Sequence, residues 1–326
     1  MNLSHADQIA KAVLYEGYML YPYRPSSVKN RQRFNFGVLY PQAYSDAQDA
    51  IDPYSLRTEC LVRGAADTLM EVRLRFLQLQ LRYSQHDDAA SMPDGWQEAI
   101  EREVAITAFT LAKGPAQTLT QSFGFPNQAT IDVSESGARI GCFQSELRGE
   151  AEVVTQEVQD NLFKVTIDVR NTSTLETSSP SRDSALLQSL VSMHAVLGVS
   201  GGEFVSLLEP PPELHAAAAE CRNLGVWPVL VGDAGQRDTL LVSPIILYDY
   251  PQIAPESAGD LFDGTEIDEI LSLRIMTLTE EEKREIRGSD ERARQILERT
   301  HNMPAEQFMK LHGAVRGLRP VKESMP

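Results

Sequence analysis

Alternation of apolar and polar residues is the clearest pattern in this chain, and it is strongest over residues 68–84. From Met70 to Phe76 the apolar side chains occupy even positions, and from Leu77 to Tyr83 they occupy odd positions. Strict alternation is typical of a strand with one buried face. A change of face within the run indicates a β-bulge or a strand that passes between two sheets. The sequence therefore predicts one long, bulged strand here.

A β-hairpin is predicted by a second alternating pattern. Its arms are residues 149–158 and 162–171, and Asp160 and Asn161 between them suit a tight turn. Residues 96–112 fit a helix or a strand, and a strand is favoured because Ile100, Val104 and Ile106 lead into a β-rich stretch. Further strands are expected at residues 226–231 and 239–250, as another hairpin.

Helical spacing of apolar residues appears at the start of the chain and again in its second half. Thr279 and Glu282 have the spacing of a capping box, and Gly288 with Ser289 could divide the charged helix that follows. The helices are expected at residues 5–19, 183–197, 212–222, 279–300 and 303–315.

These elements together predict an α+β protein. Residues 1–175 are expected to form an antiparallel β-sandwich with an N-terminal helix. Residues 176–326 are expected to be a helix-rich α+β region with one β-hairpin, either separate or packed into the same globule. The polar stretch 172–183 suits a domain linker or a long loop.

Composition and charge narrow the classes of partner. The chain has 326 residues, of which 42% are apolar, and its net charge is −16. Such an acidic surface repels nucleic acid and anionic lipid. No stretch approaches the roughly 18 apolar residues of a membrane span, so we expect neither a nucleic-acid partner nor membrane insertion. The N-terminus lacks the features of a signal peptide, and the three cysteines lack disulfide or zinc spacing, which predicts a cytoplasmic protein with reduced thiols.

One enzyme motif stands out. Residues 198–202, GVSGG, fit the G-x-S-x-G pattern of a hydrolase nucleophile elbow, with Ser200 as the nucleophile. That elbow needs a strand before the serine and a helix after it, whereas the flanking patterns here indicate the opposite order. A glycine-rich helix end and turn is the favoured interpretation. No histidine pair has metal-ligand spacing, so we expect no cofactor and lean against an enzyme.

A basic aromatic segment at residues 20–37 contrasts with the acidic chain around it. Arginine and tyrosine together are common in protein–protein hot spots. A loop neutralised by acids of the same chain, or a small-anion site, would give the same composition. The candidate partner contacts are Tyr21, Tyr23, Arg24, Lys29, Arg31 and Arg33.

An acidic segment at residues 255–270 is the second candidate contact region, through Asp260, Asp263 and Glu266. Its spacing does not fit an EF-hand loop. Acids in the first turn of a helix, or a Ca²⁺ or Mg²⁺ site, are the alternatives.

Three long stretches carry a resemblance to a known family. They are AVLYEGYMLYPYRPSSVKNRQRFNFGVLYP, CRNLGVWPVLVG and SPIILYDYPQIAPESAGDLFDGTEIDEILSLRIMTLTEEEKREIRGSDERARQILERT. They resemble accessory proteins encoded alongside nickel–iron hydrogenase genes in aerobic bacteria, over residues 3 to about 318. The resemblance implies an accessory or assembly role and supplies no catalytic residues.

The expected function is therefore a non-enzymatic, chaperone-like protein that binds hydrogenase subunits or their maturation proteins. One alternative is a hydrolase-type enzyme with a pocket between the two halves, which would bring His194 beside Ser200. Another is a sandwich that binds a carbohydrate or another small molecule, for which exposed aromatics would be needed. We expect the two tryptophans, Trp96 and Trp227, to be mostly buried.

Overall fold

The structure is a computed structural model, and its chain divides into two compact units. The first comprises Met1–Tyr18 with Gln32–Gln252, and the second comprises Met19–Arg31 with Ile253–Pro326. The residues that the structure describes are 4–16, 18, 27, 33–84, 96–133, 139–175, 181–252, 268–289 and 291–304.

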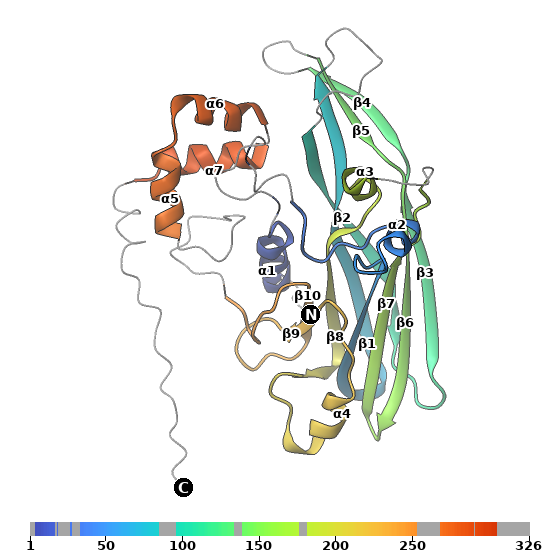
Figure 1. Cartoon of the computed structure of the whole chain (residues 1–326). Coiled ribbons are helices and arrows are strands. Elements are labelled where there is room, and N and C mark those ends of the chain that lie inside the picture. The colour runs from blue at the N-terminus through green and yellow to red at the C-terminus, as the bar shows by residue number, and fades with distance from the viewer. Residues whose placement is uncertain are drawn as a thin grey trace. The chain divides into compact units, whose positions relative to one another are not determined.

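A single antiparallel sheet makes up most of the first unit (Figure 1), and ten strands are found in it among the described residues. The strands are β1 (Ser55–Ser84), β2 (Trp96–Thr110), β3 (Gln117–Phe125), β4 (Gln128–Val133), β5 (Arg139–Gln144), β6 (Leu147–Gln159), β7 (Leu162–Asn171), β8 (Val191–Val205), β9 (Trp227–Leu230) and β10 (Thr239–Ser243).

The long strand β1 organises the sheet. Its first part pairs with β7, its middle with β8, and its later part with β2 and β5. The register with β8 shifts between Arg75 and Leu77, at the point where the apolar pattern changes face. The predicted bulged strand is therefore confirmed. Because of the bulge, both Phe76 and Leu77 are buried.

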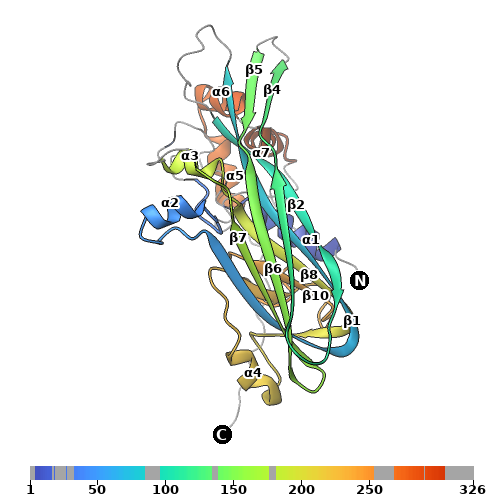
Figure 2. The same cartoon turned by 90° about the vertical axis from the view of Figure 1, so that its right-hand side faces the viewer.

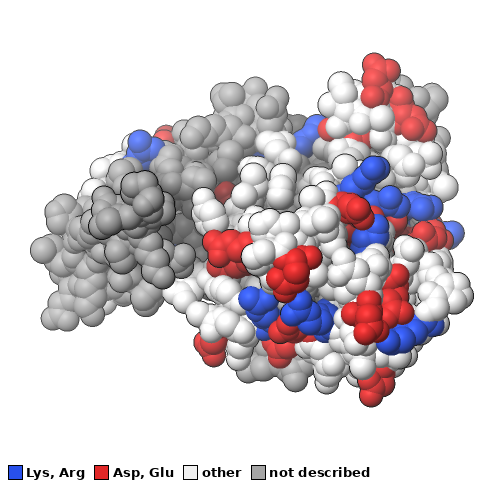
Figure 3. Space-filling model, turned by 90° about the horizontal axis from the view of Figure 1, so that it is seen from below, with Lys and Arg blue, Asp and Glu red and all other residues white. Residues whose placement is uncertain are grey.

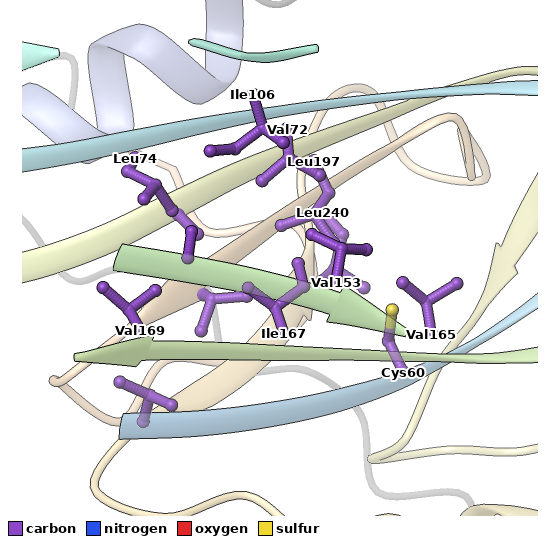
Figure 4. Packing of buried hydrophobic residues seen from close by; sticks show 14 of the residues in the cluster. Cys60, Val72, Leu74, Ile106, Val153, Val165, Ile167, Val169, Leu197 and Leu240 are labelled. Carbon is purple, nitrogen blue, oxygen red and sulfur yellow. The ribbon is translucent and has the colours of Figure 1, made fainter. Parts of the chain in front are cut away.

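Strands of this sheet supply the main hydrophobic core. Buried side chains from β1, β2, β6, β7, β8 and β10 meet in it. Figure 4 shows Leu74, Ile106, Val153, Ile167 and Leu197 among the side chains of this cluster. The predicted hairpin supplies β6 and β7, with Asn161 in its turn at a φ of 58°, a conformation that asparagine tolerates better than most residues.

The predicted α+β class is wrong, because the protein is mostly β. The ten strands form one continuous sheet in place of a separate sandwich, and β8, β9 and β10 bring residues beyond 175 into it. The helix expected at residues 183–197 is replaced by a short α3 (Arg182–Leu186) followed by β8.

Double-sided burial explains that error. Ala195 and Leu197 of β8 face the main core, whereas Val196 packs with Ala6 and Ile9 of α1 (Ser4–Leu14). A strand covered on both faces loses its alternation, so its apolar run is easily mistaken for a helix. The glycine-rich stretch after it belongs to β8 as well, and is not the helix end and turn that was expected.

Short helices complete the first unit. They are α2 (Gln42–Ala47), α3, the 3₁₀ turn η2 (Pro212–Leu214) and α4 (His215–Ala219). Figures 1 and 2 both place α2 and α3 on the same side of the sheet.

The second unit contains α5 (Asp268–Met276), α6 (Glu280–Ser289) and α7 (Glu291–His301), and α7 packs against the other two. The capping box is confirmed, because the Thr279 N–H donates to Glu282 Oε2 at 2.8 Å and the Glu282 N–H donates to Thr279 Oγ1 at 3.2 Å. The charged helix is divided where expected, because α6 ends at Ser289 and α7 begins at Glu291. Most of the helix expected at residues 303–315 lies outside the described residues. No helix in the described ranges has the length and apolarity to span a membrane.

Candidate functional site

The described part of the chain contains a pocket of about 420 Å³, which we call the Tyr40 pocket. Its walls come from the segment before β1 and the start of that strand, from Arg182 of α3, and from the loop before β9. The lining residues are Asn35, Gly37, Val38, Leu39, Tyr40, Ile51, Asp52, Pro53, Ser55, Leu56, Arg182, Leu224, Gly225 and Val226.

Backbone hydrogen bonds hold the first wall in place. The Leu39 N–H donates to the Leu190 carbonyl at 2.9 Å, and the Leu190 N–H donates back at 3.1 Å. The Tyr40 N–H donates to the carbonyl of Pro53 at 2.9 Å, which joins this wall to the segment that leads into β1. The loop is thus fixed at both ends, and the pocket is largely preformed.

Arg182 of α3 fixes the segment just before that wall. Its Nη2 donates to the Arg33 carbonyl at 2.9 Å, the Phe34 carbonyl at 3.0 Å and Asn35 Oδ1 at 3.0 Å. One charged group thereby donates hydrogen bonds to three acceptors of an irregular segment. Without regular secondary structure, such a segment cannot pair these acceptors with its own backbone.

Tyr40 is the buried polar group of the pocket. Its ring stacks on Tyr44 with the centroids 4.9 Å apart. Burial raises the pKa of Tyr40 to about 12, and the nearby Arg182 only partly opposes this. The phenol is therefore neutral at physiological pH and can both donate and accept a hydrogen bond.

Unusual backbone conformations cluster in the segment that forms this pocket. Phe34, Asp49 and Ala50 have φ between 55° and 60°, the left-handed region that side chains other than glycine rarely adopt. Gly37 has φ 54°, and a Cβ there would lie 2.6 Å from Pro244. Such strain costs on the order of 1–2 kcal/mol per residue and is concentrated at functional sites.

Exposed apolar side chains surround the pocket. Ile51 is 83% exposed and Leu224 is 63% exposed, and both line it. Phe36 and Trp227, each next to lining residues in the chain, are 42% and 40% exposed. The expectation that Trp227 is mostly buried is therefore wrong. Trp227 is the first residue of the edge strand β9, which has a sheet neighbour, β10, on one side only among the described strands.

The candidate contacts proposed from the sequence are almost all outside the described residues. This is so for Tyr21, Tyr23, Arg24, Lys29 and Arg31, and for Asp260, Asp263 and Glu266.

Arg33, the remaining candidate, is only 6% exposed. Its guanidinium carbon lies 3.6 Å from the Trp96 ring centroid and 4.7 Å from that of Phe34, and Nη2 donates to the Gln97 carbonyl at 3.0 Å. The structure thus packs this cation on aromatic rings of its own chain.

The structure does not bring the predicted hydrolase pair together. His194 and Ser200 lie six residues apart on β8, which places them roughly 20 Å from each other along an extended strand. Buried His194 Nδ1 donates to the Ser192 carbonyl at 2.7 Å, and Nε2 lies 3.2 Å from Ser243 Oγ. The GVSGG stretch lies within a strand and not at a strand-to-helix turn, so the elbow geometry is absent there.

The glycines of that stretch have a packing explanation. A Cβ on Gly202 would lie 2.8 Å from the Arg63 carbonyl oxygen of β1. Thr68 Oγ1 donates to the Gly201 carbonyl at 2.9 Å, so β1 and β8 approach closely where their register shifts.

Sequence reasoning missed the pocket residues, because they come from three segments that are far apart in the sequence, at residues 35–56, 182 and 224–226. One signal was present: Ile51 stands alone between Asp49 and Asp52 in a stretch with no strand or helix period. An isolated apolar residue in such a loop has no core face to join.

No protein family matches the chain, and a search of curated proteins finds no relative.

Proposed function

We propose that this protein is a non-enzymatic accessory protein that binds a partner protein through the Tyr40 pocket. The observation that carries the proposal is the exposure of Ile51 and Leu224 beside a preformed cavity. Both residues are large and apolar, and neither is buried by its own chain. An apolar rim around a preformed pocket is the arrangement that a hot-spot side chain of a partner fills.

The energetics favour such docking. Covering one exposed isoleucine or leucine contributes about 1.5–3 kcal/mol, so the two together supply a substantial part of a micromolar interaction. The buried phenol of Tyr40 adds a neutral hydrogen-bonding group at the pocket. The strained backbone around the pocket supports a role other than stability.

The resemblance to hydrogenase-associated proteins supplies the proposed partner class. We propose that the partner is a nickel–iron hydrogenase subunit or a maturation protein, met in the cytoplasm. Tyr21, Tyr23, Arg24, Lys29, Arg31, Asp260, Asp263 and Glu266 remain candidate contacts with the same class of partner and lie outside the described residues.

Binding to purified hydrogenase large and small subunits tests the proposal. Leu224→Asp places a charge on the pocket rim and is expected to weaken binding by about tenfold or more, as loss of a buried anchor does. Leu208→Asp is the matched control, because Leu208 is also exposed but does not line the pocket. Equal affinities for the wild type and Leu224→Asp would contradict docking at this site.

A small-molecule binding function is the second candidate, because the volume of the pocket falls in the range of ligand sites, roughly 300–1,000 Å³. A screen by thermal unfolding distinguishes the two functions. A compound that raises the Tm of the wild type but not of Leu224→Trp, which places a bulky side chain on the pocket rim, would favour the small-molecule function over the accessory one.

A further inference from the structure

Three acidic side chains lie on the segment that forms one wall of the Tyr40 pocket. Asp46 is near the end of α2, Asp49 follows in the turn, and Asp52 lines the pocket next to Ile51. Asp46 and Asp49 are exposed, and Asp52 is partly exposed. An acid near the C-terminal end of a helix faces carbonyl oxygens and is disfavoured there, so the position of Asp46 does not serve the stability of α2.

Within the described ranges, none of these three carboxylates has an ion pair or a side-chain hydrogen bond. Some acids elsewhere on the sheet are matched with cations. Asp168 makes a bidentate pair with Arg57 at 2.8 and 2.9 Å, and Glu98 pairs with Arg82 at 3.1 Å. The face seen in Figure 3 likewise carries blue and red side chains close together. The wall beside Ile51 has three carboxylates close together in the sequence and no such pair among the described contacts.

Cations of the same chain neutralise only part of the negative charge on this wall. Arg182 lines the pocket, but its Nη2 is engaged with Arg33, Phe34 and Asn35. Exposed Arg222 stands two residues before Leu224, on the segment that forms another wall. The negative potential is therefore concentrated on the Ile51 side, and the net charge of −16 reinforces it at longer range.

We infer that the partner segment that occupies the Tyr40 pocket is basic: it inserts one apolar side chain against Ile51 and Leu224 and places Lys or Arg beside Asp46, Asp49 and Asp52. This inference rests on the proposed function and specifies its partner chemistry. Charge complementarity raises the association rate and excludes acidic competitors, while the apolar anchor supplies most of the affinity. A second copy of this chain is a poor occupant, since two molecules of charge −16 repel each other.

Selection from a displayed library of random dodecapeptides on the full chain tests the inference, with counter-selection on the Leu224→Asp variant. The selected peptides are expected to contain Lys or Arg within a few positions of one Leu, Ile, Phe or Trp. For a selected peptide, the triple variant D46N/D49N/D52N is expected to lower affinity about tenfold at low salt, and the loss should shrink at high salt as screening sets in.

The matched control neutralises three exposed acids away from the pocket, D67N/E209Q/D233N, and leaves the same net charge as the test variant. The control should retain the affinity of the wild type within about twofold, because screening limits the reach of distant charges.

The outcomes separate the two claims. Pocket-dependent peptides that are uncharged or acidic, or that bind D46N/D49N/D52N as well as the wild type, would overturn the inference and leave pocket docking intact. A library with no binder sensitive to Leu224→Asp would overturn both. A dimer in sedimentation velocity that Leu224→Asp dissociates would identify a second copy as the occupant and likewise overturn the inference.

Discussion

The guanidinium of Arg33 lies 3.6 Å from the centre of the Trp96 ring, and this contact joins the segment before the Tyr40 pocket to strand β2. Arg33→Gln removes the charge and the stacking, and we expect it to lower the free energy of unfolding by about 1–2 kcal/mol. Urea denaturation measures the change. Arg170→Gln, at an exposed cation of β7, is the control.

Arg33→Lys separates charge from stacking, because lysine keeps the cation but lacks the planar group. We expect it to recover only part of the lost stability. If Arg33→Gln unfolds at the same urea concentration as the wild type, the contact with Trp96 does not stabilise the fold, and a contact made only with a partner becomes the better account of Arg33.

His194 should make stability depend on pH. Burial lowers its pKa to about 4, and the nearby cation of Arg75 acts in the same direction. In the unfolded chain this histidine titrates near its ordinary value of about 6.5. Between these two values the unfolded state binds more protons than the folded state, so stability falls as pH drops from about 6.5 toward 4.

The size of the effect is on the order of 3 kcal/mol when the full window is crossed. Urea denaturation at a series of pH values should show the wild type losing stability over this window more steeply than His194→Gln, in which that titration is absent. Parallel curves for the two proteins would show that His194 is not held neutral by the fold.

Matched leucine truncations test which side chains stabilise the fold. Leu74 is fully buried in the main core, so Leu74→Ala is expected to cost about 2–5 kcal/mol in the free energy of unfolding. Leu224→Ala, at a residue 63% exposed on the pocket rim, should change it by less than about 0.5 kcal/mol. A large loss at Leu224 would mean that this side chain serves the fold rather than a partner.

Local sequence pattern predicted those parts of the fold in which one face meets the core. The bulged strand around Phe76, the hairpin through Asn161 and the Thr279 capping box each leave a signal within a few neighbouring residues. The failure at β8 has a physical cause, because α1 covers the face of Val196 that would otherwise be polar.

The candidate site could not be predicted in the same way. Tyr40, Ile51 and Leu224 meet only because the sheet brings separate loops together, and no short-range pattern encodes such a meeting. For Arg33, composition suggested a site that the tertiary structure does not form. Its basic, aromatic neighbourhood suggested an outward-facing patch, but the tertiary structure places its guanidinium over Trp96, far along the chain. Composition indicates which groups are present and not which of them meet.

Hydrogen–deuterium exchange of the full chain, with and without a purified subunit of the nickel–iron hydrogenase proposed as its partner, tests the central claim most directly. The account predicts slower exchange in the peptides that cover residues 38–40, 51–56 and 224–226, which form the walls of the Tyr40 pocket. Unchanged exchange in all three peptides, with protection found elsewhere in the chain, would contradict it.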